Sequence, residues 1–128
     1  MSTMLICIPS YSRIGCLEGI DPEVSSLAFI TGDYSVQSHL KKRGFKDIYF
    51  IKQNAQYLLI HLPVTRVLLL EDKIADTCNL IQILQASIRA PITVITRNSH
   101  YPTKLYELIG AKQVLYSKQD HLGYFLNQ

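Results

Sequence analysis

The residues best placed to bind a ligand lie in a turn between an apolar run and a predicted helix. Residues 27–31 are apolar and predict a strand, and residues 32–38 follow directly. In the dinucleotide fingerprint, glycines recur at the first, third and sixth positions because the backbone approaches a pyrophosphate and the helix packs closely on the sheet. Gly32 fills the first position here, whereas Tyr34 and Gln37 occupy the other two. The turn therefore predicts a nucleotide-binding type of fold in which two of the three glycines that let the backbone approach a ligand have been replaced.

The start of the predicted helix at 36–43 is a second candidate site. Ser35 and Val36 lie where free N–H groups and the helix dipole attract an anion, even without glycines. The alternative is an ordinary helix with Ser35 as its N-cap and Gly44 as its C-cap. The sequence is compatible with both an anion-binding site and an ordinary capped helix.

Polar residues follow two further predicted strands. Arg97 ends the apolar run 92–96, and a guanidinium at that edge could clamp a phosphate or pair with Glu71 or Asp72 of the neighbouring strand. Asp72 and Asn79 could hydrogen-bond a nucleotide, or they could cap the helix that follows. The sequence thus offers candidate ligand contacts without deciding between binding and capping.

Other reactive residue types give weaker signals. Lys52 could pair with a 2′-phosphate or lie exposed at a strand end, and Cys78 is expected to pack rather than react. His100 and Tyr101 could stack on a base or belong to a polar loop. No Ser-His-Asp order, paired carboxylates or Cys-His arrangement stands out, and the four histidines lack metal-ligand spacing. We therefore expect neither catalysis nor a metal.

Apolar runs and helical patterns alternate along the chain. The predicted strands are 4–8, 27–31, 47–52, 67–70, 92–96 and 113–116, and the predicted helices are 36–43, 76–88, 102–109 and 121–126. Residues 9–22 predict a loop or broken helix, and 55–62 a short helix or strand. Such alternation with short connections predicts a three-layer α/β Rossmann-like domain with a mostly parallel sheet. Residues 1–128 are expected to form one domain, in which residues 1–26 add an edge strand and a loop.

Composition narrows the class of protein. Of the 128 residues 48% are hydrophobic and 18% charged, and the net charge is +3, typical of a globular chain. Three cysteines without a Cys-x-x-Cys pair favour a reducing compartment, and no apolar run approaches about 18 residues. The cationic cluster at 41–43 is interpreted as a solvated helix end rather than a nucleic-acid site. With no basic leader, a cytoplasmic location is expected.

The second half of the chain carries an ordered series of motifs. They occupy residues 67–72, 76–80, 92–97, 105–111 and 114–116. The series resembles the RCK or TrkA-N family, the cytoplasmic nucleotide-binding domains that regulate potassium channels and transporters. In that family's pattern an Asn opens a helix, a strand ends in Ala-Arg, and a later helix ends in Gly-Ala. Asn79, Arg97, Gly110 and Ala111 match those places.

The resemblance implies a role, and the sequence also departs from the family pattern in two places. It implies a non-catalytic ligand-sensing or assembly domain, a homodimer, a membrane transporter or channel subunit as partner, and an adenine nucleotide or NAD as ligand. The family's acidic ribose-binding residue would fall near Lys52 and Gln53, and the link 53–66 is short, so a third strand is expected to be missing or reduced. The alternatives are a small α/β enzyme and a receiver-like signalling domain.

Overall fold

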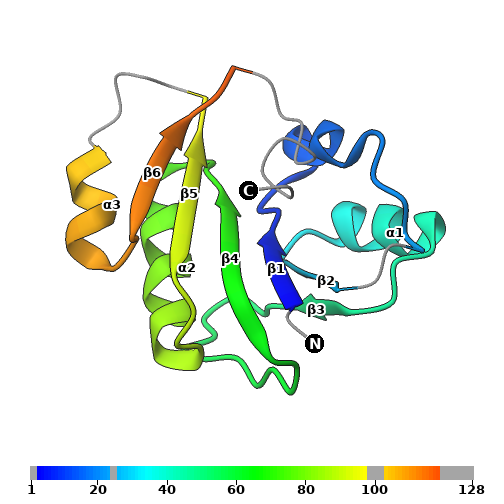
Figure 1. Cartoon of the computed structure of the whole chain (residues 1–128), viewed down its shortest axis with the longest axis horizontal. Helices are drawn as coiled ribbons and strands as arrows, with labels where there is room; N and C mark the ends of the chain where they lie inside the picture. The colour runs from blue at the N-terminus through cyan, green and yellow to red at the C-terminus, as the bar shows by residue number, and fades with distance from the viewer. Residues whose placement is uncertain (1–2, 24–25, 98–102, 119–128) are drawn as a thin grey trace.

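Parallel strands form one continuous sheet at the centre of the molecule (Figure 1). The structure is a computed structural model that describes residues 3–23, 26–97 and 103–118. Within these residues six strands lie in the order β3-β2-β1-β4-β5-β6, and every neighbouring pair is parallel. The strands are β1 (Thr3–Cys7), β2 (Leu27–Thr31), β3 (Ile48–Phe50), β4 (Val64–Leu70), β5 (Ile92–Thr96) and β6 (Gln113–Tyr116).

Helices cover both faces of this sheet. One face carries the 3-10 helix η1 (Tyr11–Leu17) and α1 (Tyr34–Arg43), and the other carries α2 (Ile74–Ser87) and α3 (Thr103–Ile109) (Figure 1). Each face has its own hydrophobic cluster, because successive strand residues point to opposite sides. Ile6, Phe29 and Leu68 lie in the first cluster, whereas Leu5 and Leu69 lie in the second. The predicted three-layer α/β Rossmann-like fold is confirmed, with a sheet that is parallel throughout the described strands.

The N-terminal strand β1 lies at the centre of the sheet, so the expected edge strand is wrong. Met4 is paired with Leu27 of β2 on one side, and Leu5 is paired with Val67 of β4 on the other. All residues from Leu5 to Ile8 are fully buried. A continuous apolar run is typical of a strand covered on both faces, which an edge position does not provide. Since β1 is the first strand, β3 is the third strand; it is present but is only three residues long.

The crossover from β3 to β4 is an irregular segment, residues 51–63, rather than the short helix or strand considered for 55–62. Leu58, Ile60 and Leu62 pack against the hydrophobic cluster on the α2 face. The backbone N–H of Leu58 donates a 2.7 Å hydrogen bond to the Ser87 hydroxyl of α2. The segment therefore occupies the position of a crossover helix and partly buries these three side chains in the same layer, whereas Leu59 is 71% exposed.

Helix boundaries differ from the predictions at their caps. Asp33, not Ser35, is the N-cap of α1, because its carboxylate accepts the Ser35 N–H at 2.8 Å. Gly44 ends α1 as predicted, with a left-handed φ of 94°. The loop or broken helix predicted at 9–22 contains η1. The predicted helix at 121–126, together with His100 and Tyr101, lies outside the described residues.

Candidate functional site

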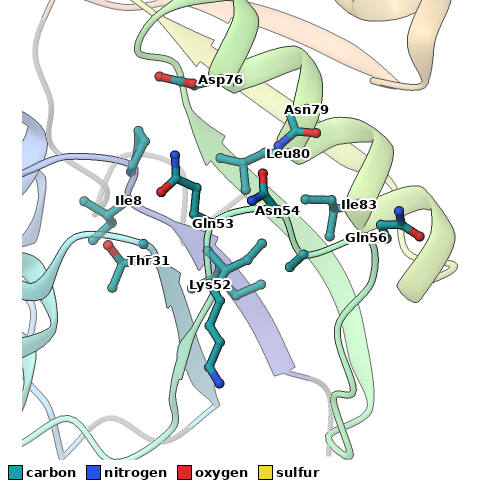
Figure 2. Close-up of a pocket in the computed structure, with 15 residues that line it drawn as sticks. Ile8, Thr31, Lys52, Gln53, Asn54, Gln56, Asp76, Asn79, Leu80 and Ile83 are labelled. Atoms are coloured by element: carbon teal, nitrogen blue, oxygen red, sulfur yellow. The ribbon is translucent and has the colours of Figure 1, made fainter.

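A cleft of about 710 Å³ opens at the carboxyl ends of β1, β2 and β3 (Figure 2). Helix α2 forms its opposite wall. Open α/β sheets bind ligands outside the carboxyl ends of their strands, and ligand pockets commonly span about 300–1,000 Å³. Its lining residues are Ile8, Pro9, Ile30, Thr31, Gly32, Ile51, Lys52, Gln53, Asn54, Ala55, Gln56, Asp76, Asn79, Leu80 and Ile83.

Four amide side chains supply most of the polar groups of this cleft. Gln53, Asn54 and Gln56 come from the crossover, and Asn79 comes from α2 (Figure 2). Asn54 has a φ of 73°, and the Ala55 N–H donates to the Lys52 carbonyl at 3.1 Å. These values describe a type II turn, in which the third residue adopts a positive φ that Asn tolerates. The turn places two amides, Gln53 and Asn54, at its tip.

Gly32 lets the two strand ends approach each other beside the cleft. A Cβ at Gly32 would lie 3.3 Å from both the Cγ2 and the carbonyl oxygen of Ile51. That separation is tight for a carbon contact, so a larger residue would push the crossover away from β2. Packing against Ile51 therefore favours glycine at this position.

The predicted site residues do not all share this cleft. Gly32 and Asn79 line it, whereas Ser35 lies in a second hollow of about 380 Å³ beside Lys42. The Val36 side chain is fully buried in the core under α1. Neither Ser35 nor Val36 lines the cleft with Gly32 and Asn79, so ligand contact by these two residues stays a prediction.

Asp72 and Arg97 follow β4 and β5, outside the residues that line the cleft. Asp72 is half-buried, and its backbone N–H donates to the Thr77 hydroxyl at 3.2 Å. Arg97 is exposed at the end of β5. Their contact with a ligand also stays a prediction. Lys52 does line the cleft, but its side chain extends away from the amides (Figure 2).

Because β1 is the first strand, the first strand-to-helix turn is residues 8–10, and η1 begins at Tyr11. Ser10, Ser12 and Gly15 stand at the spacing of the three fingerprint positions. The fingerprint was instead predicted after β2, from Gly32 onward. The signal was present in the chain: an apolar run at 4–8 is followed by small residues at that spacing.

The turn and the start of η1 form hydrogen bonds within the chain. The Tyr11 N–H donates to Asp33 Oδ2 at 3.1 Å, and the Ser10 and Ser12 hydroxyls lie 2.6 Å apart. A carboxylate thus lies against the first backbone N–H of η1, at the end of the helix that faces the phosphate in a dinucleotide site. Helix η1 is itself a seven-residue 3-10 helix rather than an α-helix. Neither feature favours a bound pyrophosphate.

A buried arginine crosses the point where the strand order reverses, between β1 and β4. Arg13 is 1% exposed, and its guanidinium donates to the carbonyl of Glu71, at the end of β4. A longer contact of 3.5 Å reaches the carbonyl of Ile95 in β5. Cofactors of this fold bind across this crevice. Here a side chain of the chain itself contacts the strand ends.

Glu71 continues the buried polar cluster toward α3. Its carboxylate accepts hydrogen bonds from the Thr96 hydroxyl and the Tyr106 phenol, both at 2.6 Å, and Glu71 is only 4% exposed. Burial, and then the hydrogen bond to Glu71, raise the pKa of Tyr106 above its ordinary value. This cluster was not predicted from the sequence, in which Glu71 was expected only as an ion-pair partner of Arg97.

The described residues show two further negative findings. None of their helices is long and apolar enough to cross a bilayer. Across residues 3–23, 26–97 and 103–118 no three His, Cys, Asp or Glu side chains are grouped as metal ligands. Burial raises the pKa of the Cys7 thiol to about 12, so that thiol is protonated at neutral pH.

Comparison with known proteins supports the fold. No protein-family model and no curated protein matches the sequence. Among solved structures, the crystal structure of the GsuK RCK domain matches with a TM-score of 0.59 and 17% sequence identity. The match covers 89% of this chain and 25% of that chain. The chain therefore has an RCK-like fold and spans about a quarter of the length of the protein that it matches.

Proposed function

We propose that this chain is a non-catalytic ligand-sensing or assembly domain of the RCK type, with a degenerate dinucleotide site. The observation that carries the proposal is the amide-lined cleft at the carboxyl edge of an RCK-like sheet. Amide groups donate and accept hydrogen bonds but do not exchange protons as general acids or bases. The cleft carries four amides against one carboxylate, Asp76, and one amine, Lys52, so this lining suits binding better than catalysis.

The cleft also joins elements whose separation a ligand could change. Gln53 and Gln56 belong to the irregular crossover, whereas Asn79 belongs to α2. A ligand that bonds both would favour the conformation in which crossover and helix lie close together. That shift would be transmitted to a second copy of the chain or to a transporter or channel subunit in the cytoplasm.

A thermal-shift screen tests ligand sensing. ATP, ADP, AMP, NAD, NADH, cyclic dinucleotides and the common ribonucleosides are each added to the purified chain. We expect at least one to raise Tm by several degrees, and we expect Asn79→Ala to remove that rise. Gln82→Ala is the matched control, because Gln82 lies on the same helix, is exposed and does not line the cleft.

Light scattering on the same sample tests assembly. A dimer without any ligand shift would support the assembly role alone. A monomer whose Tm no compound changes would contradict both roles. A ligand shift that survives Asn79→Ala would remove this cleft from the proposal.

A further inference from the structure

The crossover between β3 and β4 contains an extended segment at the surface of the molecule. Its backbone neither turns nor bends from residue 55 to residue 61, and exposed and partly buried side chains alternate from 57 to 62. The inward side chains pack on the hydrophobic cluster beside α2, and the outward ones are Tyr57, Leu59 and His61. Tyr57 is 64% exposed and Leu59 is 71% exposed. This period of two is that of a β-strand, although the segment pairs with no strand of the described sheet.

The backbone of this segment presents hydrogen-bonding groups to solvent along one edge. The Leu58 N–H is bonded to the Ser87 hydroxyl on the α2 side. Successive N–H groups of an extended chain point to opposite edges, so those of Tyr57, Leu59 and His61 point away from α2. None of these three N–H groups donates to a residue within 3–23, 26–97 or 103–118. An added strand can therefore accept all three.

Resting on the assembly role proposed above, we infer that residues 57–61 pair with the same residues of a second copy of the chain, antiparallel and centred on Leu59. In this register Leu59 lies opposite Leu59 of the second copy, and Tyr57 lies opposite His61 of the second copy. Each of these opposing pairs exchanges two backbone hydrogen bonds. The exposed side chains also gain a cross-strand neighbour, so the interface buries Tyr57 and Leu59.

The two ends of the segment favour a second copy over an unrelated strand. In the register centred on Leu59, Ala55 lies opposite Pro63 of the second copy. The Ala55 N–H is bonded to the Lys52 carbonyl at 3.1 Å, and Pro63 has no N–H. Both positions therefore lack a free donor, and they are the positions that oppose each other. Two copies related by a two-fold axis thus match along the whole segment and leave no donor unpaired at its ends.

The distribution of charge also permits pairing between copies. Residues 53–63 contain no Asp, Glu, Lys or Arg, so no like charges meet across the two-fold axis. The edge strands of the sheet differ in this respect. Exposed lysines flank β3 at 46 and 52 and flank β6 at 112 and 118. Lysines on edge strands oppose pairing with another chain, whereas the crossover has no such protection.

Cysteine cross-linking of the full chain tests the register. Leu59→Cys places two thiols opposite each other at a Cα separation of about 5.5 Å, which a disulfide can span. With copper phenanthroline and oxygen, we expect a covalent dimer to form at least tenfold faster than for Tyr57→Cys. The thiols of Tyr57→Cys would lie about 14 Å apart. The unmodified chain, whose three cysteines are buried or half-buried, is the background control.

A mixture of two variants gives a second test of the same register. Equal amounts of Tyr57→Cys and His61→Cys should cross-link to each other faster than either variant cross-links alone, because residues 57 and 61 oppose each other across the axis. Equal cross-linking rates for Leu59→Cys and Tyr57→Cys would overturn the inferred pairing.

Analytical ultracentrifugation tests whether this pairing holds the dimer. Leu59→Lys places two ammonium groups opposite each other, and we expect the dimer Kd to rise at least tenfold. Leu108→Lys is the matched control, because Leu108 on α3 is 84% exposed, and it should keep Kd within about twofold of wild type. Circular dichroism checks that both variants fold. A dimer that Leu108→Lys disrupts and Leu59→Lys does not would place the interface on α3 and overturn the inference.

Failure of this inference differs from failure of the proposed function. If wild type and Leu59→Lys dimerise equally, the interface lies elsewhere and the assembly role stands. If the wild-type chain is a monomer at the highest concentration that stays soluble, both the inference and the assembly role are wrong, and the thermal-shift screen alone decides ligand sensing.

Discussion

Arg13 is the residue that most alters the crevice at the carboxyl edge of the sheet, where cofactors of this fold bind. Its side chain crosses from the β1 loop to the carbonyls of Glu71 and Ile95, where a cofactor would otherwise join the two halves of the sheet. A buried guanidinium is stable only when its N–H groups are bonded, and here backbone carbonyls accept them. The arginine therefore links the strand ends without a ligand.

Replacing this arginine should weaken the fold. Arg13→Met keeps the apolar length but removes the guanidinium donor from the buried Glu71 carbonyl, whereas the Ile95 carbonyl still accepts the Glu71 N–H. We therefore expect the free energy of unfolding to fall by about 3 kcal/mol. Urea unfolding followed by circular dichroism measures the change. Arg89→Met, at an exposed arginine, is the control and should change stability by less than about 0.5 kcal/mol. Equal stability in both variants would contradict the linking role of Arg13.

The Glu71–Tyr106 hydrogen bond should appear in the pH dependence of stability. The pKa of Tyr106 lies above its ordinary value of 10.0 in the folded state. Above pH 10 the unfolded chain loses this proton while the folded chain keeps it, so the contribution is complete below pH 10 and declines as pH rises. Cys7, whose pKa is raised to about 12, adds a decline that begins near pH 9.

Tyr106→Phe separates the two groups. At pH 7 it should lower stability by about 1–2 kcal/mol, because Glu71 loses a buried donor. Above pH 10 the difference between wild type and Tyr106→Phe should shrink. Urea unfolding at pH 7, 9, 10 and 11 gives this difference, and a constant value across the range would show that Tyr106 titrates normally.

At the scale of elements, the crossover 51–63 decides the shape of the cleft. It lacks regular secondary structure, yet it is held to α2 by the Leu58 N–H bond to the Ser87 hydroxyl, which itself donates to the Ile83 carbonyl at 2.7 Å. This relay satisfies a backbone group that a helix would otherwise have satisfied. Gly32 allows the same crossover to approach β2.

Removing the relay should loosen the crossover. Ser87→Ala leaves the Leu58 N–H without its partner, and we expect a loss of about 1–2 kcal/mol together with faster amide hydrogen exchange in residues 51–63. Mass-spectrometric hydrogen exchange reports the local change. Ser38→Ala, at an exposed position on α1, should leave exchange in the crossover unaffected. Unchanged exchange in Ser87→Ala would mean that apolar packing alone holds the segment.

At the scale of the whole molecule, β1 joins the two halves of the sheet. It is bonded to β2 on one side and to β4 on the other, and both hydrophobic clusters include its side chains. Removal of a central strand exposes both clusters at once, whereas removal of an edge strand exposes only one border.

Deletion of residues 1–8 should therefore prevent folding. We expect the truncated chain to lack a cooperative thermal transition, as measured by circular dichroism and differential scanning calorimetry. Disruption of the edge strand β6 by Val114→Pro should lower Tm while a cooperative transition is retained, since β6 is paired on one side only in the described sheet. A cooperative transition in the truncated chain would contradict the central role of β1.

Local residue types in the sequence determined the fold class and most of the elements. The apolar runs at 67–70 and 92–96 could only be buried strands, and Gly44 could be read as a helix end, because these features depend on neighbours along the chain. Gly32 was predicted from the first position of the dinucleotide fingerprint, and Asn79 from its match to the Asn that opens a helix in the RCK or TrkA-N pattern.

Only the tertiary structure decided which strand lies at the centre and which polar groups meet. The central position of β1, the bond from the Tyr11 N–H to the Asp33 carboxylate and the contacts of Arg13 with Glu71 and Ile95 join residues between 22 and 82 positions apart. Such pairings depend on how two hydrophobic layers pack against one sheet. The periodicity of residue types along the chain does not predict them.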